Sequence, residues 1–209
     1  MYIPEKFREE RAEFLHPLMR AHALATLITV GDSGIIANHV PMELNPEPAP
    51  FGTLRGHIAR ANPLWKQYRP GSEVLAVFQG PERYISPNLY ASKQETGEVV
   101  PTWNYAVVHA RGTLSFTEEA QWLLRLVTRL TDSHEAAQGA PWKVTDAPEA
   151  YTQSMLKLIV GFEIAISSLV GKFKLSQNRT LPDRRGVLAG LEASSDPSAR
   201  EMAGMLDIE

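Results

Sequence analysis

The stretch V-P-T-W-N-Y-A-V-V-H-A-R-G, residues 100–112, begins a predicted strand with side chains that stack and form hydrogen bonds. The two-residue period of a strand puts Trp103 and Tyr105 on one face and Thr102 and Asn104 on the other. A flat heteroaromatic ligand needs both an aromatic surface and matched donors and acceptors. The alternative is a structural strand whose aromatic rings lie in the core.

The stretch G-K-F-K-L-S-Q-N-R-T, residues 171–180, concentrates hydrogen-bond donors at the end of another predicted strand. Lys172 and Lys174 share one strand face, and polar residues follow directly. Such donors suit a phosphate or the polyol chain of a nucleotide. A charged strand edge that resists aggregation is the alternative. The candidate ligands of an anion here are Lys174, Gln177, Asn178 and Arg179.

The stretch L-R-G-H-I-A-R-A-N-P-L-W, residues 54–65, predicts a strand followed by the start of a helix. Asn62 is a good N-cap and Pro63 suits the first helical position. Backbone N–H groups at such a helix start favour anions, and Arg60 and His57 could add side-chain donors. The alternative is an ordinary helix start beside a solvated arginine.

The motifs that are missing exclude several kinds of site. The sequence contains no G-x-G-x-x-G, no G-x-x-x-x-G-K-[ST], no H-E-x-x-H and no G-x-S-x-G. Its six histidines are scattered without metal-ligand spacing, and it has no cysteine. We therefore predict no metal site and no catalytic residue that the sequence alone can identify.

Composition predicts an ordinary soluble globular protein. The chain has 209 residues, of which 44% are hydrophobic and 22% charged, and its net charge is −3. That charge gives no general attraction to nucleic acid or to an anionic membrane. The N-terminal residues are too charged for a signal peptide, and no apolar run reaches the length of a membrane span. We expect a cytoplasmic protein without membrane contact.

Hydrophobic periodicity predicts the elements that must position these stretches. A helix is predicted over residues 5–20, and a hairpin is predicted from strands 23–30 and 35–42 around a turn at 31–34. Further strands are predicted at 53–59, 73–80, 102–117 and 158–174, with a short helix at 62–68 and a longer one at 118–136. One or two small helices are predicted from Pro182 onward. This pattern favours a mainly β protein with α additions, a barrel or a sandwich.

Five longer stretches of the sequence resemble those of a known family. They are M-Y-I-P-E-K-F (1–7), G-H-I-A-R-A-N-P-L-W (56–65), F-Q-G-P-E-R-Y-I-S-P-N-L-Y (78–90), V-P-T-W-N-Y-A-V-V-H-A-R-G (100–112) and K-L-S-Q-N-R (174–179). In this order they resemble the PaiB-like family of FMN-binding negative transcriptional regulators, and the resemblance spans nearly the whole chain.

The resemblance implies an FMN-binding split β-barrel that forms a homodimer with FMN near the subunit interface. We expect the split-barrel domain over residues 1–181, with residues 182–209 as a helical extension of the same domain. The expected FMN contacts are His57, Arg60, Thr102, Trp103, Asn104, Tyr105, Lys174, Gln177, Asn178 and Arg179.

The function stays open between three alternatives at this stage. The resemblance implies a negative transcriptional regulator that acts on DNA or on a partner protein, although the sequence shows no helix-turn-helix spacing. A flavin-dependent oxidoreductase that uses NAD(P)H is the second alternative. A split-barrel scaffold that has lost its flavin is the third.

Overall fold

The computed structural model describes residues 1–31 and 34–206 and consists mainly of β-strands with helices added. The strands are β1 (Arg8–Glu9), β2 (Leu24–Gly31), β3 (Gly34–Pro41), β4 (Glu43–Asn45), β5 (Thr53–Ala59), β6 (Glu73–Ile85), β7 (Thr102–Thr117) and β8 (Ile159–Lys174). The α-helices are α1 (Ala12–Ala21), α2 (Leu64–Gln67), α3 (Ser92–Glu95), α4 (Ala120–Glu135), α5 (Glu149–Leu156), α6 (Leu181–Glu192) and α7 (Pro197–Ala203). Three 3₁₀ helices are η1 (Glu5–Phe7), η2 (Pro87–Leu89) and η3 (Val144–Asp146).

The described strands form one sheet in the order β3-β2-β6-β7-β8-β5-β4, and β1 pairs with β8. The pairs β1–β8, β2–β3, β2–β6, β4–β5 and β5–β8 are antiparallel. The predicted class, mainly β with α additions, is therefore confirmed. Across the described residues, no helix is both long and apolar enough to cross a membrane.

The chain divides into two compact units, each built from separate segments. The first unit contains Met1–Ala21, Gln79–Val108 and Val170–Glu209. The second unit contains His22–Phe78 and His109–Leu169. Each of the three long strands, β6, β7 and β8, contributes residues to both units.

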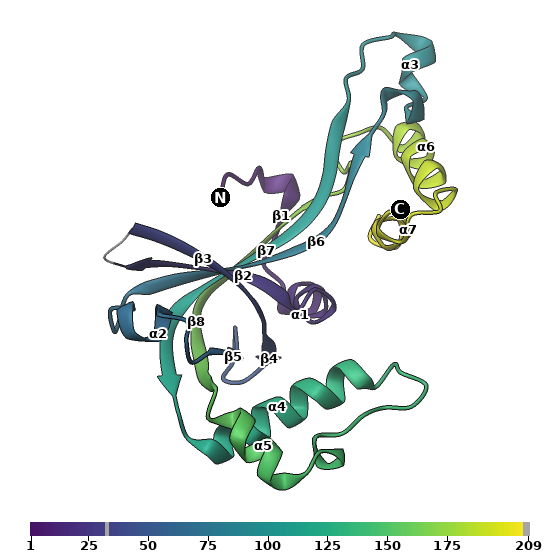
Figure 1. Ribbon diagram of the computed structural model, residues 1–209. Helices are drawn as coiled ribbons and strands as arrows, with labels where there is room; N and C mark the ends of the chain where they lie inside the picture. Colours follow the sequence, from purple (N-terminus) through teal and green to yellow (C-terminus); the bar gives the residue numbers. More distant parts are fainter. Residues whose placement is uncertain (32–33, 207–209) are drawn as a thin grey trace. The chain divides into compact units, whose positions relative to one another are not determined.

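The second unit contains the predicted hairpin and the predicted long helix. Strands β2 and β3 pair along their whole length, from Leu24 opposite Pro41 to Gly31 opposite Gly34. Asp32 and Ser33 of the predicted turn lie outside the described residues. Helix α4 begins after Glu119, whose carboxylate accepts hydrogen bonds from two backbone N–H groups of the first turn. Figure 1 shows α5 beside α4, and the two helices are in contact.

Strands β5 and β8 of the second unit are brought close by a glycine. Gly56 stands opposite Phe162 in the strand register. A Cβ atom at position 56 would lie 2.5 Å from the Phe162 ring, which is fully buried. The absence of a side chain at Gly56 thus leaves room for the buried Phe162 ring.

The N-terminal segment of the first unit differs from its prediction as one helix over 5–20. Residues 5–7 form the 3₁₀ helix η1, and Arg8 and Glu9 form β1, paired with Lys172 and Gly171 of β8. The α-helix begins only at Ala12. The prediction was wrong for residues 5–11. Pairing with β8 holds Arg8 and Glu9 extended, a long-range contact that overrides helical periodicity and ends the 3₁₀ helix before them.

The C-terminal helices of the first unit form a small core with the ends of β6 and β8. Ile85, Tyr90, Leu175, Val187, Leu191, Ala199, Met202 and Ala203 make up this core. The buried Asp183 of α6 accepts hydrogen bonds from the backbone N–H of Ser92 at 2.9 Å and from its hydroxyl at 2.8 Å. These bonds tie α6 to α3, and Figure 1 shows both helices at the far ends of β6 and β7.

Candidate functional site

The start of β7 and the end of β8 meet in the first unit through a lysine. The Nζ atom of Lys174 donates hydrogen bonds to the hydroxyl of Thr102 and, at 2.5 Å, to the backbone carbonyl of Trp103. Strands β7 and β8 are neighbours in the sheet, which places these residues side by side. Two stretches that the sequence predicted separately therefore form one site.

Two further cations, Lys172 and Arg179, lie near Lys174, and the groups that bond directly to Lys174 carry no negative charge. Lys172 donates to the carbonyl of Tyr2 at 3.2 Å and lies 5.3 Å from the centre of the Tyr105 ring. The guanidinium of Arg179 lies 4.5 Å from the centre of the Tyr90 ring. Burial, followed by repulsion from Lys172 and Arg179, lowers the pKa of Lys174. A bound anion would relieve this repulsion.

A buried amide lies next to this lysine and has an unused acceptor. Asn104 is fully buried, and its amide N–H donates to the Ser176 hydroxyl at 2.8 Å. Within the described part of the chain, its Oδ1 atom has no hydrogen-bond partner. Ser176 adopts a φ of 66°, which few residues other than glycine adopt. A buried acceptor without a donor and a strained backbone are both typical of binding sites.

An exposed aromatic pair adjoins the same strand. Trp103 is 53% exposed and Tyr84 of β6 is 48% exposed, and their rings meet edge to face at 6.0 Å between centres. Both side chains line a cavity of about 430 Å³, together with Glu82, Arg83, Asp196 and Ser198. Large rings seldom stay this exposed without a partner or a ligand.

These residues form one candidate site, which we call the Lys174 cluster. It comprises Thr102, Trp103, Asn104, Tyr105, Lys172, Lys174, Ser176 and Arg179. Three cations suit a phosphate, Trp103 offers an exposed aromatic surface, and Asn104 has an unused acceptor. This donor set fits a phosphorylated heteroaromatic molecule such as FMN.

Two further predicted residues from the same stretch have different surroundings. Gln177 folds back on the strand end, where its Oε1 accepts from the Leu175 N–H at 2.7 Å and its Nε2 donates to the Phe173 carbonyl at 2.5 Å. Its amide therefore already stabilises the turn that follows β8. Asn178 is exposed on that turn.

The two remaining predicted residues belong to the second unit. His57 of β5 lines an apolar cavity beside α4 and α5. Arg60 donates from Nε to the Lys157 carbonyl at 2.6 Å and from Nη2 to the Ile159 carbonyl at 3.2 Å, and it pairs with Glu118. The Asn62 carboxamide oxygen accepts from the Leu64 N–H at 3.0 Å, although the residue at the N-cap of the short helix α2 is Pro63 and not the predicted Asn62. The donors of Arg60 are thus used within the chain.

Sequence reasoning missed Tyr84 and Tyr90 as neighbours of the site. Tyr84 lies on β6, and its pairing with Trp103 depends on how β6 and β7 come together in the first unit. Tyr90 lies below Arg179 because η2 packs against α6. No local pattern signals either contact, since each joins residues that are far apart in the sequence.

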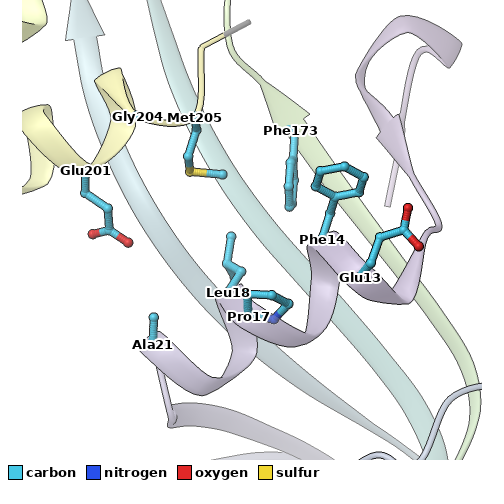
Figure 2. A pocket seen from close by; sticks show the side chains of 9 residues that line it. All are labelled: Glu13, Phe14, Pro17, Leu18, Ala21, Phe173, Glu201, Gly204 and Met205. Atoms are coloured by element: carbon cyan, nitrogen blue, oxygen red, sulfur yellow. The ribbon is translucent and has the colours of Figure 1, made fainter.

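A second hollow of the first unit contains none of the ten predicted residues. Figure 2 shows Phe14, Leu18, Phe173 and Met205 pointing toward one another in a groove of about 380 Å³. The carboxylates of Glu13 and Glu201 lie on opposite sides of these apolar groups. The groove is therefore mainly apolar, unlike the Lys174 cluster.

Two solved structures with a similar fold are named as flavin proteins. The FAD and heme binding protein from Mycobacterium smegmatis has a TM-score of 0.59 at 15% identity, over 94% of this chain and 97% of that one. The flavocytochrome Anf3 from Azotobacter vinelandii has a TM-score of 0.58 at 10% identity, over 83% of this chain and 70% of that one. At these identities the likeness shows the fold alone, and it confirms the predicted split-barrel class.

Sequence relatives establish the family. The protease synthase and sporulation protein PAI 2 of Bacillus subtilis is 32% identical over 207 residues, which are 99% of this chain and 97% of that protein. The uncharacterized protein AN0679 of Emericella nidulans is 35% identical over 227 residues, covering 92% of this chain and 90% of that protein. A family model described as a putative FMN-binding domain matches residues 1–168. The chain therefore belongs to this FMN-binding family, the PaiB-like family that the sequence predicted, and FMN is the cofactor of the family.

Proposed function

We propose that this chain binds FMN at the Lys174 cluster and acts as a flavin-dependent regulator in the form of a homodimer. The observation that carries the proposal is the convergence of Lys172, Lys174 and Arg179 beside exposed aromatic rings, with a lowered pKa at Lys174. Membership of the FMN-binding family supports the identity of the ligand.

Each part of the cluster has a role in this proposal. The three cations hold the phosphate dianion, whose oxygens accept charge-assisted hydrogen bonds from their N–H groups. Trp103 and Tyr105 contact the ring system, and Thr102 and Asn104 provide polar partners. When bound, FMN supplies a redox-active ring whose electronic state depends on the groups around it. The predicted contacts from Gln177 and Asn178 remain part of the proposal. The proposal does not keep the predicted contacts from His57 and Arg60, because both residues belong to the second unit, where His57 lines an apolar cavity and Arg60 bonds to groups of its own unit.

A homodimer would cover the exposed aromatic surface of the first unit. Tyr2 is 82% exposed, in addition to the Tyr84 and Trp103 rings. Aromatic side chains are enriched at protein–protein interfaces because they bury a large area with little loss of side-chain entropy. We therefore propose that a second copy covers Trp103 and places the FMN site near the subunit interface.

A regulatory role is supported by the name of a relative. The Bacillus subtilis relative is named a protease synthase and sporulation protein. This chain carries a net charge of −3, so any direct DNA contact must come from a local surface. We propose that the state of the bound flavin alters the dimer and thereby its contact with DNA or with a partner protein.

Flavin titration is the first test of the proposal. The purified chain is titrated with FMN while flavin absorbance and fluorescence are followed. We expect saturable binding of one FMN per chain. A linear response without saturation would contradict FMN binding and leave the cluster as a structural feature.

The regulatory part needs a separate test. The target DNA should migrate more slowly with the protein at physiological salt, and unrelated competitor DNA should not abolish the shift. A shift that any DNA removes would contradict sequence recognition by the chain itself. Consumption of NADH or NADPH by the FMN-loaded protein with an added electron acceptor would instead favour an oxidoreductase.

A further inference from the structure

The second unit contains an apolar cavity of about 320 Å³ among α4, η3, α5, β5 and the start of β8. Most of its lining is aliphatic or aromatic. The polar atoms belong to two threonine hydroxyls, one imidazole, the Tyr151 hydroxyl and the Trp142 indole N–H. The lining residues are His57, Val127, Thr131, Trp142, Val144, Ala147, Tyr151, Thr152, Met155, Leu156, Leu158 and Ile159. A volume of this size lies in the range that accommodates a small organic molecule.

His57 is the polar side chain that distinguishes this cavity from ordinary core. It is half-buried on β5, opposite Gly161 of β8, and the Trp122 ring occupies the space where Gly161 lacks a side chain. Burial lowers the pKa of His57, and no charged or hydrogen-bonding group contributes to the shift. The His57 ring lines the cavity and can form hydrogen bonds with a molecule bound there. A neutral imidazole offers one donor and one acceptor.

The mouth of the cavity exposes large apolar side chains to solvent. Trp142 is 47% exposed, Tyr151 57% and Leu158 57%. The backbone N–H of Trp142 donates to the Glu135 carboxylate at 2.9 Å, which holds the segment that carries the indole. A second cavity of about 330 Å³ shares His57, Thr131 and Trp142 with the first. An apolar hollow with a few polar side chains is the usual composition of a small-molecule site.

The lining also defines the charge of an occupant. No side chain of the first cavity is a carboxylate, a lysine or an arginine. An ion placed there would lose its hydration without gaining a counter-charge, which is strongly unfavourable. The phosphate of FMN does not fit such a cavity, whereas a neutral aromatic molecule does.

We propose that this cavity is a second ligand site, for a small neutral aromatic molecule that carries one hydrogen-bonding group. His57 pairs with that group, and Trp142 and Tyr151 contact the ring. The site is built entirely within the second unit and is independent of FMN binding at the Lys174 cluster. A neutral effector bound here gives the protein a second input besides flavin.

The test compares indole with 1-methylindole by isothermal titration of the full chain in the presence of excess FMN. The two probes differ in one N–H group, so the comparison isolates the hydrogen bond to His57. We expect saturable binding of one indole per chain, about tenfold tighter than 1-methylindole, because methylation leaves the imidazole without its partner. Absence of saturable indole binding, or equal affinity for both probes, would overturn the proposal. Indole binding that occurs only without FMN would also overturn it, because the two sites would then not be independent.

Two variants locate the binding within the cavity. His57→Phe should remove the preference for indole over 1-methylindole, whereas His39→Phe, at an exposed position of β3 in the same unit, should retain it. Ala147→Phe should abolish binding of both probes by filling the space. Retention of indole binding in Ala147→Phe would overturn the proposal. If Ala147→Phe instead lowers the mass of the protein in solution, a second copy occupies this surface, and the small-molecule site is excluded.

Discussion

At the scale of single residues, Lys174 carries most of the argument for an anion site. Its ammonium group has neutral direct partners and two cationic neighbours, and burial lowers its pKa further. An ammonium in such surroundings is more stable when a phosphate is bound beside it. Arg60 is also a cation in a predicted contact position, but carbonyl groups and a carboxylate of its own unit already use its donors.

The first prediction concerns the phosphate. We expect Lys174→Ala to weaken FMN binding about 10- to 100-fold, the usual effect of losing a charge-assisted hydrogen bond. Riboflavin, which lacks the phosphate, should lose much less affinity. Titration of both flavins with the variant and with Lys66→Ala, a lysine of the second unit, provides the measurement and its control. Equal losses for the two flavins would remove Lys174 from the phosphate site.

The second prediction concerns acid stability. Burial lowers the folded-state pKa of His57 below its ordinary value of 6.5, so the unfolded chain binds the proton more tightly. This contribution leaves the free energy of unfolding unchanged well above pH 6.5 and lowers it as the pH falls below that value. We expect His57→Phe to show a shallower loss of stability between neutral and mildly acidic pH in urea unfolding. The exposed control His39→Phe should keep the wild-type slope, and a His57→Phe slope equal to wild type would contradict the account.

At the scale of elements, two glycines allow η2 to pack against α6. A Cβ atom at Gly186 would overlap the backbone carbonyl of Leu89, and one at Gly190 would lie 2.6 Å from the Leu89 side chain. Glycine lowers intrinsic helix stability, so these two positions in α6 are explained by close approach. The contact holds the segment after Ile85 against the C-terminal helices.

The third prediction separates these two glycines. We expect Gly186→Ala to lower the free energy of unfolding by about 2 kcal/mol, because a backbone carbonyl cannot move aside locally. Gly190→Ala should cost less, because the Leu89 side chain can rotate and alanine favours the helix by up to about 1 kcal/mol. Urea unfolding of both variants is the measurement. A larger loss in Gly190→Ala would show that packing against Leu89 is not the cause.

The fourth prediction concerns the connection between β5 and the start of β8. Arg60 bonds to the carbonyl groups of Lys157 and Ile159 and pairs with Glu118. We expect Arg60→Ala to lower the free energy of unfolding by about 1 to 2 kcal/mol, since two carbonyl groups lose their donor. Glu118→Gln should cost less than about 1 kcal/mol, because it leaves the carbonyl bonds intact and removes only a largely exposed ion pair. Thermal unfolding compares the two, and an equal loss would place the stabilisation in the ion pair.

At the scale of the whole molecule, the proposed homodimer and the proposed second ligand site use different surfaces. The exposed aromatic pair Tyr84 and Trp103 belongs to the first unit, and the cavity at His57 belongs to the second. A protein with one site for flavin and another for a neutral aromatic molecule can respond to two signals. This organisation agrees with the proposed regulatory role.

The fifth prediction tests the dimer. We expect Tyr84→Glu to shift the protein toward monomer in sedimentation experiments, because a carboxylate buried at an interface without a partner is strongly unfavourable. Ile35→Glu introduces the same charge at a side chain of the second unit that is 78% exposed, and it should leave the mass unchanged. A monomeric wild-type chain at all concentrations would contradict the homodimer, and dissociation by Ile35→Glu would place the interface elsewhere.

The sequence alone determined the long strands, the long helix α4 and the family. Alternating apolar residues placed β5 and β7 at their observed bounds, and the 3.6-residue period predicted α4 to within two residues, because both patterns depend on which faces are buried. The five stretches that resemble the PaiB-like family, taken in order along the chain, predicted FMN as the cofactor of the family. Local spacing was wrong at residues 5–11, where a distant strand intervenes, and it did not predict β4, α3, α5 or the last five residues of β6.

Only the tertiary structure decided which of these residues lie together. It joined Lys174 to Thr102 and Trp103, gave Asn104 a partner in Ser176, and placed Tyr84 against Trp103. In the tertiary structure His57 also lines an apolar cavity, and Arg60 donates its hydrogen bonds to the Lys157 and Ile159 carbonyls. Hydrophobic periodicity and secondary-structure propensity indicate the face of an element on which a side chain lies. Its neighbours depend on strand pairing between segments that are many residues apart in the sequence.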